Sequence, residues 1–202
     1  MDRLNRRDAL KVLGTVPVAA GVALTEAEAQ HAHQQAQTAR QTARRTGAAF
    51  KPKFFTQHEY ATVRILADMI IPADERSGSA SDAGVPEFMD FIMIDMPARQ
   101  VPMRGGLAWL DHDALQRFDR TFADCTPAQR GEIVDAISGI EEDPARRQGQ
   151  AFFRNFRDLT SSGFWTSRMG IKDLAYIGNT FVPEWTGCPR EALAKLGLDT
   201  AD

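Results

Sequence analysis

Few residues in this sequence of 202 have the types and spacing that chemistry requires. Asp111, His112 and Asp113 could work as a general acid and base, because a carboxylate next to an imidazole supports proton transfer. Consecutive residues of a helix point in different directions, however, so we interpret this triplet as a solvated helix face. His58 falls in the first turn of an expected helix and needs no catalytic role.

Other site classes are also missing their usual signatures. His31 and His33 could bind a metal, but the sequence offers no complete ligand set for them. The GxGxxG, GxxxxGK[ST], CxxCH, HExxH and GxSxG motifs do not occur. The net charge of −3, without a basic stripe, makes nucleic acid an unsuitable partner. We therefore expect no catalytic residue, no cofactor and no metal in this chain.

The first 29 residues have the three parts of a secretory signal. Arg6 and Arg7 lie in a basic region, residues 12–24 are uncharged, and Ala27 and Ala29 form a small-x-small cleavage site. The adjacent arginines indicate the Tat pathway, so we predict a folded protein exported to the periplasm through the Tat translocase. The uncharged run is shorter than the about 20 residues of a membrane span. An uncut signal that tethers the protein to the membrane is the alternative.

Export to an oxidising compartment bears on Cys125 and Cys188, the only two cysteines. An even number of cysteines there predicts a disulfide. If these two pair, the closed loop of about 60 residues would stabilise the fold by about 4 kcal/mol in the chain-entropy model. Two alternatives stay open, namely two free thiols packed as small apolar groups and a bond from one cysteine to a partner subunit.

The remaining sequence predicts a flexible tether followed by one all-α domain. Residues 30–53 contain no large apolar side chain before Phe50, which indicates a flexible polar linker. Residues 54–202 are rich in helix formers and lack the alternating runs typical of strands. Sequence patterns of the capping-box type begin at Thr56 and Thr126. About five helices are expected, near 57–71, 85–96, 107–125, 127–140 and 144–160, with a Pro/Gly connection at 98–106.

From Ser161 onward, aromatic residues are mixed with Gly, Pro and Asn. This pattern predicts an irregular segment that packs on another surface, followed by a short closing helix at 190–196. Aromatic residues are enriched in the cores of protein interfaces. The candidate partner interface is formed by Phe164, Trp165, Tyr176 and Trp185. The alternative is that this segment covers the core of its own domain.

Several stretches, in this order, resemble the gluconate 2-dehydrogenase subunit 3 family. They include Phe54-Phe55-Thr56, Leu66-Ala67-Asp68-Met69-Ile70-Ile71-Pro72-Ala73-Asp74, Asp82-Ala83-Gly84-Val85-Pro86, Gly106-Leu107-Ala108-Trp109-Leu110-Asp111 and Tyr176-Ile177-Gly178-Asn179. The resemblance runs from Phe54 to Leu198. It implies a non-catalytic small subunit, exported together with a large flavoprotein that oxidises sugars or sugar acids. FAD would belong to that partner, which a multihaem cytochrome c often joins.

Three functions are consistent with these observations. The first is a subunit that assembles with a flavoenzyme and supports its export. The second is a docking protein held at the membrane by an uncut signal, and the third is a stand-alone enzyme with an unrecognised helical site. A co-purifying flavoprotein would distinguish the first from the third, and N-terminal sequencing would distinguish the first from the second.

Overall fold

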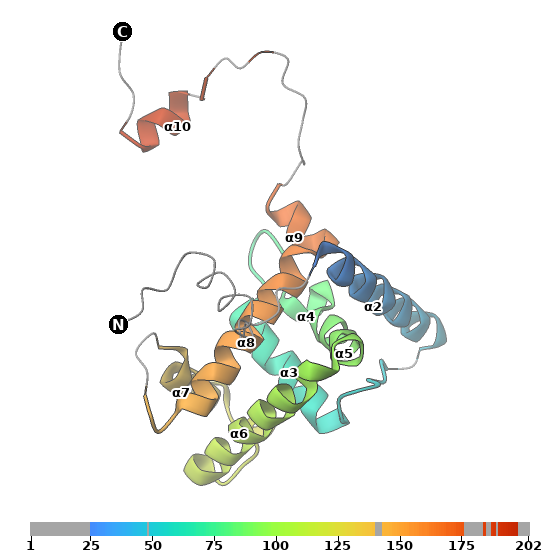
Figure 1. Ribbon diagram of the computed structural model, residues 1–202, viewed down its shortest axis with the longest axis vertical. Helices are drawn as coiled ribbons and strands as arrows, with labels where there is room; N and C mark the ends of the chain where they lie inside the picture. The colour runs from blue at the N-terminus through green and yellow to red at the C-terminus, as the bar shows by residue number, and fades with distance from the viewer. Residues whose placement is uncertain are drawn as a thin grey trace, which may run out of the picture.

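The computed structural model describes residues 25–47, 49–139, 143–175, 184, 187–188 and 190–197. Within these ranges the chain forms helices and no strand, which confirms the all-α prediction (Figure 1). The elements are α2 (Glu26–Thr46), α3 (Gln57–Ile70), α4 (Ala80–Ala83), α5 (Val85–Asp95), η1 (Pro97–Arg99), α6 (Gln100–Phe118), η2 (Phe122–Asp124), α7 (Pro127–Ser138), α8 (Arg147–Trp165), α9 (Arg168–Asp173) and α10 (Arg190–Lys195). The predicted export residues Arg6 and Arg7 lie outside the described residues.

Helix α5 lies at the centre of the fold. Every residue from Val85 to Met93 is buried, because α5 packs against α2, α3, α4 and α8 (Figure 1). Gly84 precedes this helix with a φ of 88°, a left-handed conformation that glycine adopts without steric cost. Pro86 occupies the first turn, where its missing amide removes no helical hydrogen bond. The other helices are thus arranged around α5, a short helix that is almost wholly buried.

Two helix starts follow the local patterns that predicted them. The Thr56 side chain accepts a hydrogen bond from the Glu59 amide at 3.1 Å, and the Glu59 carboxylate accepts one from the Thr56 amide at 2.8 Å. Thr126 and Gln129 form the same reciprocal pair at the start of α7. Each box satisfies amides that have no partner within the helix. Both predicted capping boxes are confirmed.

The carboxylate of Asp90 joins the segment before α3 to the central helix. One oxygen accepts a hydrogen bond from the Lys53 amide at 2.8 Å, and the other accepts bonds from the Phe54 and Phe55 amides, both at 3.0 Å. Asp90 is fully buried. A buried carboxylate is stable in a protein only when such donors replace its water, so this contact holds the family-like Phe54-Phe55-Thr56 stretch against α5.

The prediction of a flexible linker at 30–53 is wrong over most of its length. Residues Glu26–Thr46 form α2, which packs against α5. Ala29, Ala32 and Ala36 form its buried face, with exposed fractions of 2%, 0% and 2%. Small side chains allow two helices to approach closely. This helix therefore docks even though it lacks the large apolar side chains whose absence had suggested a flexible linker. The Arg40 guanidinium adds a hydrogen bond to the Asp82 carbonyl at 3.0 Å.

A buried imidazole connects α2 with α5 and α8. His33 stacks on Phe88 with 4.6 Å between ring centroids, and its Nε2 lies 2.7 Å from Thr166 Oγ1. Desolvation lowers the pKa of His33 below its ordinary value, while a hydrogen bond with the Gly163 backbone partly offsets this shift. The folded state therefore takes up a proton on His33 less readily than the unfolded state does.

We predict that acid weakens the fold through His33. Its stabilising effect is complete above the unfolded pKa of about 6.5 and declines as the pH falls below that value, because only the unfolded state gains the proton readily. Thermal melting between pH 8 and 5 should show a steeper loss for the wild type than for His33→Gln, which does not titrate. Parallel melting profiles of the two proteins would show that His33 is not the group responsible.

The α5–α6 connection is also more helical than the sequence suggests. We expected an irregular connection at 98–106 and a helix at 107–125, but η1 leads directly into α6, which spans Gln100–Phe118. Pro102 lies in the first turn of α6, where a helix tolerates proline. The helix ends at Asp119, whose φ of 53° is left-handed. Phe122, expected on this helix, lies instead in η2 and is fully buried.

Helix α8 carries an aromatic ridge on its buried face. Phe152, Phe153, Phe156 and Leu159 are all buried. The helix begins at Arg147 instead of the expected Asp143-Pro144, which forms a turn, and it continues past Ser161 to Trp165. The segment after Ser161 is therefore helical at its start and not irregular. The closing helix appears as α10, and none of its residues is buried.

Cys125 and Cys188 are both free thiols in the structure. Cys125 is 3% exposed and belongs to the core, whereas Cys188 lies at the surface. The predicted intramolecular bridge is thus not present, because one thiol is packed inside and the other is outside. Burial raises the pKa of the Cys125 thiol, which disfavours the reactive thiolate. Of the two alternatives, a bond from the exposed Cys188 to a partner subunit stays open.

Candidate partner interface

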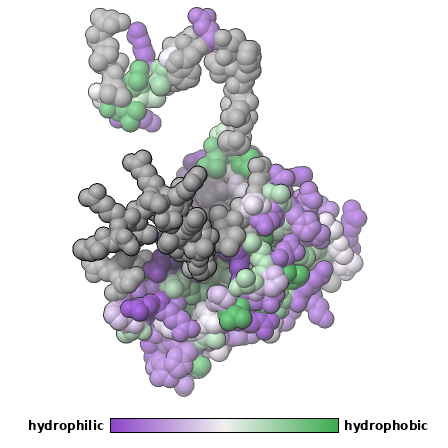
Figure 2. All heavy atoms as spheres, viewed as in Figure 1, coloured by the Kyte–Doolittle hydropathy of each residue, from purple (hydrophilic) through white to green (hydrophobic). Residues whose placement is uncertain are grey.

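Large apolar side chains are exposed together where α8 ends and α9 follows. Trp165 is 38% exposed, Ile171 40% and Leu174 56%. Figure 2 shows apolar residues at the surface in the area where Figure 1 places the end of α9. Exposed apolar residues that gather in one area are typical of an interaction surface, whereas single ones are not. We refer to Trp165, Ile171 and Leu174 as the α9 surface.

The turn between α8 and α9 fixes which side of α9 faces outward. The Ser167 hydroxyl donates to the Phe164 carbonyl at 2.6 Å and accepts from the Gly170 amide at 3.0 Å. A Cβ atom on Gly170 would lie 2.1 Å from the Phe164 carbonyl oxygen, so only glycine allows this approach. With Gly170 buried, Ile171 and Leu174, three residues apart, share the exposed side of the helix.

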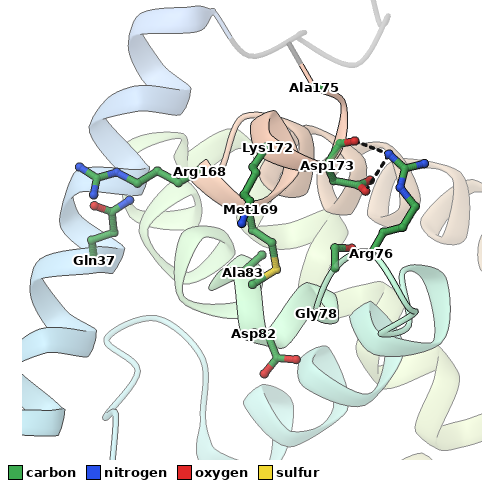
Figure 3. Close-up of a pocket in the computed structure, with 11 residues that line it drawn as sticks. Gln37, Arg76, Gly78, Asp82, Ala83, Arg168, Met169, Lys172, Asp173 and Ala175 are labelled. Atoms are coloured by element: carbon green, nitrogen blue, oxygen red, sulfur yellow. Dashed lines mark hydrogen bonds and ion pairs between the residues drawn. The ribbon is translucent and has the colours of Figure 1, made fainter. Parts of the chain in front are cut away.

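An ion pair anchors the C-terminal end of α9. Arg76 Nη2 lies 3.2 Å from Asp173 Oδ1 and also donates to the Asp173 carbonyl. Asp74 shapes the loop that presents Arg76, because its Oδ1 accepts from the amides of Arg76 and Ser77 at 2.9 and 2.8 Å. These backbone hydrogen bonds lower the pKa of Asp74. Figure 3 shows Arg76 and Asp173 facing each other.

An open cleft of about 740 Å³ lies beside the α9 surface. It is bordered by α2, the loop before α4, and α9, and Arg168 extends from α9 in the direction of α2 (Figure 3). Its charged lining consists of Arg76, Arg168, Lys172, Asp82 and Asp173. Histidine and cysteine are absent among the described residues that line it. Its charges suit the polar rim of an interface.

The structure separates the four residues of the predicted interface. Phe164 is 1% exposed and belongs to the core, so placing it in an interface was wrong. Trp165 packs edge-on against Phe164 at 4.9 Å and remains partly exposed. Tyr176 and Trp185 lie outside the described residues. Sequence reasoning missed Ile171 and Leu174, whose spacing of three residues was the available signal.

Asp111, Asp113 and His58, which were considered for acid–base chemistry, have structural partners. One oxygen of Asp111 accepts from the Phe122 amide at 2.9 Å, and the other lies 2.6 Å from His58 Nε2. Asp113 pairs with Arg117 one turn further along α6 at 2.9 Å. Asp111 therefore connects α6 with α3 and η2. In the part of the chain that the structure describes, no three His, Cys, Asp or Glu side chains gather as metal ligands do.

The described residues form a helical domain with a buried central helix and an exposed apolar corner. The family model described as Gluconate 2-dehydrogenase subunit 3 matches residues 57–183, more than half of the chain. The chain belongs to this family, as its sequence predicted. Neither the curated proteins nor the solved structures gave a match. No helix among the described residues is long and apolar enough to cross a bilayer.

Proposed function

We propose that this chain is the non-catalytic small subunit of a dehydrogenase complex that oxidises CH–OH groups of sugars or sugar acids. The observation that supports this function is the family match, which begins with α3 and extends past α9. The large subunit would hold FAD and the substrate, and a multihaem cytochrome c could take up the electrons. The α9 surface is the site that we assign to the large subunit, because exposed apolar residues that gather in one area are typical of interaction sites and tryptophan is enriched among interface hot spots.

Purification of the tagged chain with its native neighbours tests this proposal. The expected result is a co-eluting larger protein with the absorption spectrum of a bound flavin, whose sugar-oxidising activity follows the tagged chain through each column. Removal of the tag from the same strain is the control for non-specific retention. Recovery of this chain without any flavoprotein, or sugar oxidation by the purified chain alone, would contradict the proposed role.

The α9 surface predicts which substitutions weaken the complex. Trp165→Ala combined with Leu174→Ala should lower the affinity for the large subunit by at least about tenfold, corresponding to about 1.4 kcal/mol. Val101→Ala is the matched control, because Val101 is 81% exposed and belongs to α6. Titration of the immobilised large subunit measures the affinity, and melting of each isolated variant checks its fold. Equal affinities of the double variant and the control would exclude this surface.

The proposed route of export makes a separate prediction. Arg6→Lys combined with Arg7→Lys should leave the folded chain and its large subunit in the cytoplasm, because lysine does not reproduce the planar guanidinium. Arg3→Lys is the control, since it makes the same change outside the pair. Sugar dehydrogenase activity in the periplasmic fraction is the measurement. Wild-type periplasmic activity in the double variant would disprove joint export by this signal.

A further inference from the structure

The predicted cleavage site lies in the first turn of α2, which is closed by hydrogen bonds. The Glu28 carboxylate accepts from the Thr25 amide at 2.8 Å and from the Thr25 hydroxyl at 2.7 Å, and the Glu28 amide donates to the Thr25 hydroxyl at 3.3 Å. The Ala29 amide donates to the Thr25 carbonyl at 3.0 Å. The backbone from Thr25 to Ala29 is therefore capped and helical up to the bond that signal peptidase would cut.

The same turn is held against the protein body. Ala29 is 2% exposed and begins the buried stripe that continues through Ala32 and Ala36. Two polar contacts also hold α2 to the rest of the protein. His31 Nδ1 lies 3.0 Å from Asp95 Oδ2, and His33 contacts Thr166. The family match begins only at residue 57, so α2 precedes the matched core and docks onto it.

Proteases cut a native chain where the backbone is exposed and free of hydrogen bonds, or after a local opening. Cleavage here breaks the bond between the Ala29 carbonyl carbon and the Gln30 nitrogen, and water supplies a hydroxyl to Ala29 and a proton to the Gln30 amine. The enzyme has to hold several residues on both sides of that bond in an extended conformation. Neither the capped first turn nor the buried Ala29 allows this while α2 is docked.

We propose that docking of α2 protects the Ala27–Ala29 cleavage site, so that the signal is removed only from molecules in which α2 has opened. This inference rests on the proposed export signal, but it concerns the folded chain itself. When opening and closing are fast, the rate of cleavage follows the population of the open form. Folding of the core and removal of the signal are thus coupled through one helix.

Digestion of the purified full-length protein by purified signal peptidase in detergent tests this coupling. A synthetic peptide of residues 20–35 should be cut between Ala29 and Gln30, and the folded wild type at least about tenfold more slowly. Ala32→Glu combined with Ala36→Glu places two charges on the buried stripe and should raise the rate towards that of the peptide. Mass spectrometry identifies the cut, and circular dichroism checks that the core helices remain.

The matched control is Gln34→Glu combined with Thr38→Glu, which adds the same charges at the same spacing on exposed positions of α2. This variant should resist cleavage like the wild type. The proposal fails if the wild type is cut as fast as the peptide, if the stripe variant stays resistant, or if the peptide itself is not cut at Ala29. The digestion uses purified protein, so failure of the export proposal would appear only in the fractionation of the Arg6 and Arg7 variant.

Discussion

Asp90→Asn is expected to lower the free energy of unfolding by about 3 kcal/mol, because it breaks a fully buried set of charge-assisted hydrogen bonds. Both oxygens of Asp90 accept bonds from backbone amides, so the amide group of asparagine has no orientation that satisfies all three donors. Its NH₂ group would face the amide of Lys53 or those of Phe54 and Phe55. Unfolding in urea measures the change, which should appear as a lower midpoint.

Asp158→Asn is the matched control for this loss. Asp158 lies on α8, its side chain is 68% exposed, and its partner is the neighbouring Arg157. Exposed ion pairs contribute little, so the stability of this variant should stay within about 0.5 kcal/mol of the wild type. A similar small effect for Asp90→Asn would show that the segment before α3 is not held by this carboxylate.

The parts of the fold that the sequence predicted correctly depend on neighbours along the chain. The Thr56 and Thr126 caps need only a partner three residues later, and the spacing within α8 is enough to define its apolar ridge. Gly84 and Pro86 likewise mark the start of α5 through their own backbone preferences. These signals do not depend on what packs against the helix, and the sequence contains them in full.

The errors concern packing partners. Alanines give a weak apolar signal, so the buried stripe of α2 became evident only once α5 was seen to lie against it. Phe164 and Trp165 are adjacent aromatic residues with the same expected role, yet one is 1% exposed and the other 38%. Phe164 faces the core because α8 continues to Trp165 and places Phe164 eight residues after the buried Phe156, on the same face of the helix. The composition of the segment carries no information about that choice.

The Gly105-Gly106 pair is a second case in which the sequence does not reveal the packing partner. The two adjacent glycines look alike in the sequence, but one is tightly packed and the other is not. A Cβ atom on Gly106 would lie 1.8 Å from Phe152 Cδ2, whereas for Gly105 the nearest atom is Gln148 Nε2 at 4.0 Å. Two adjacent glycines suggested a connection, but here they lie inside α6, where one of them receives an aromatic ring of α8. Of these two positions, only 106 requires glycine for the contact between α6 and α8.

We expect Gly106→Ala to lower the free energy of unfolding by about 2 kcal/mol, because overpacking outweighs the higher helix propensity of alanine. The ring of Phe152 is 6% exposed and packs on Phe156 with 5.5 Å between centroids, so it has little room to move. Gly105→Ala should instead stabilise the protein by about 0.5–1 kcal/mol, since only the propensity term remains. In urea unfolding, the midpoints of the two single variants should therefore shift in opposite directions from that of the wild type.

A double-mutant cycle with Phe152→Ala identifies the cause of the loss at Gly106. Removal of the ring opens the space that the new methyl group needs, so Gly106→Ala should cost much less in the Phe152→Ala background than in the wild type. Gly105→Ala should have the same effect in both backgrounds, because it does not contact the ring. Equal costs of Gly106→Ala with and without the ring would show that the α6–α8 contact is not what requires glycine at this position.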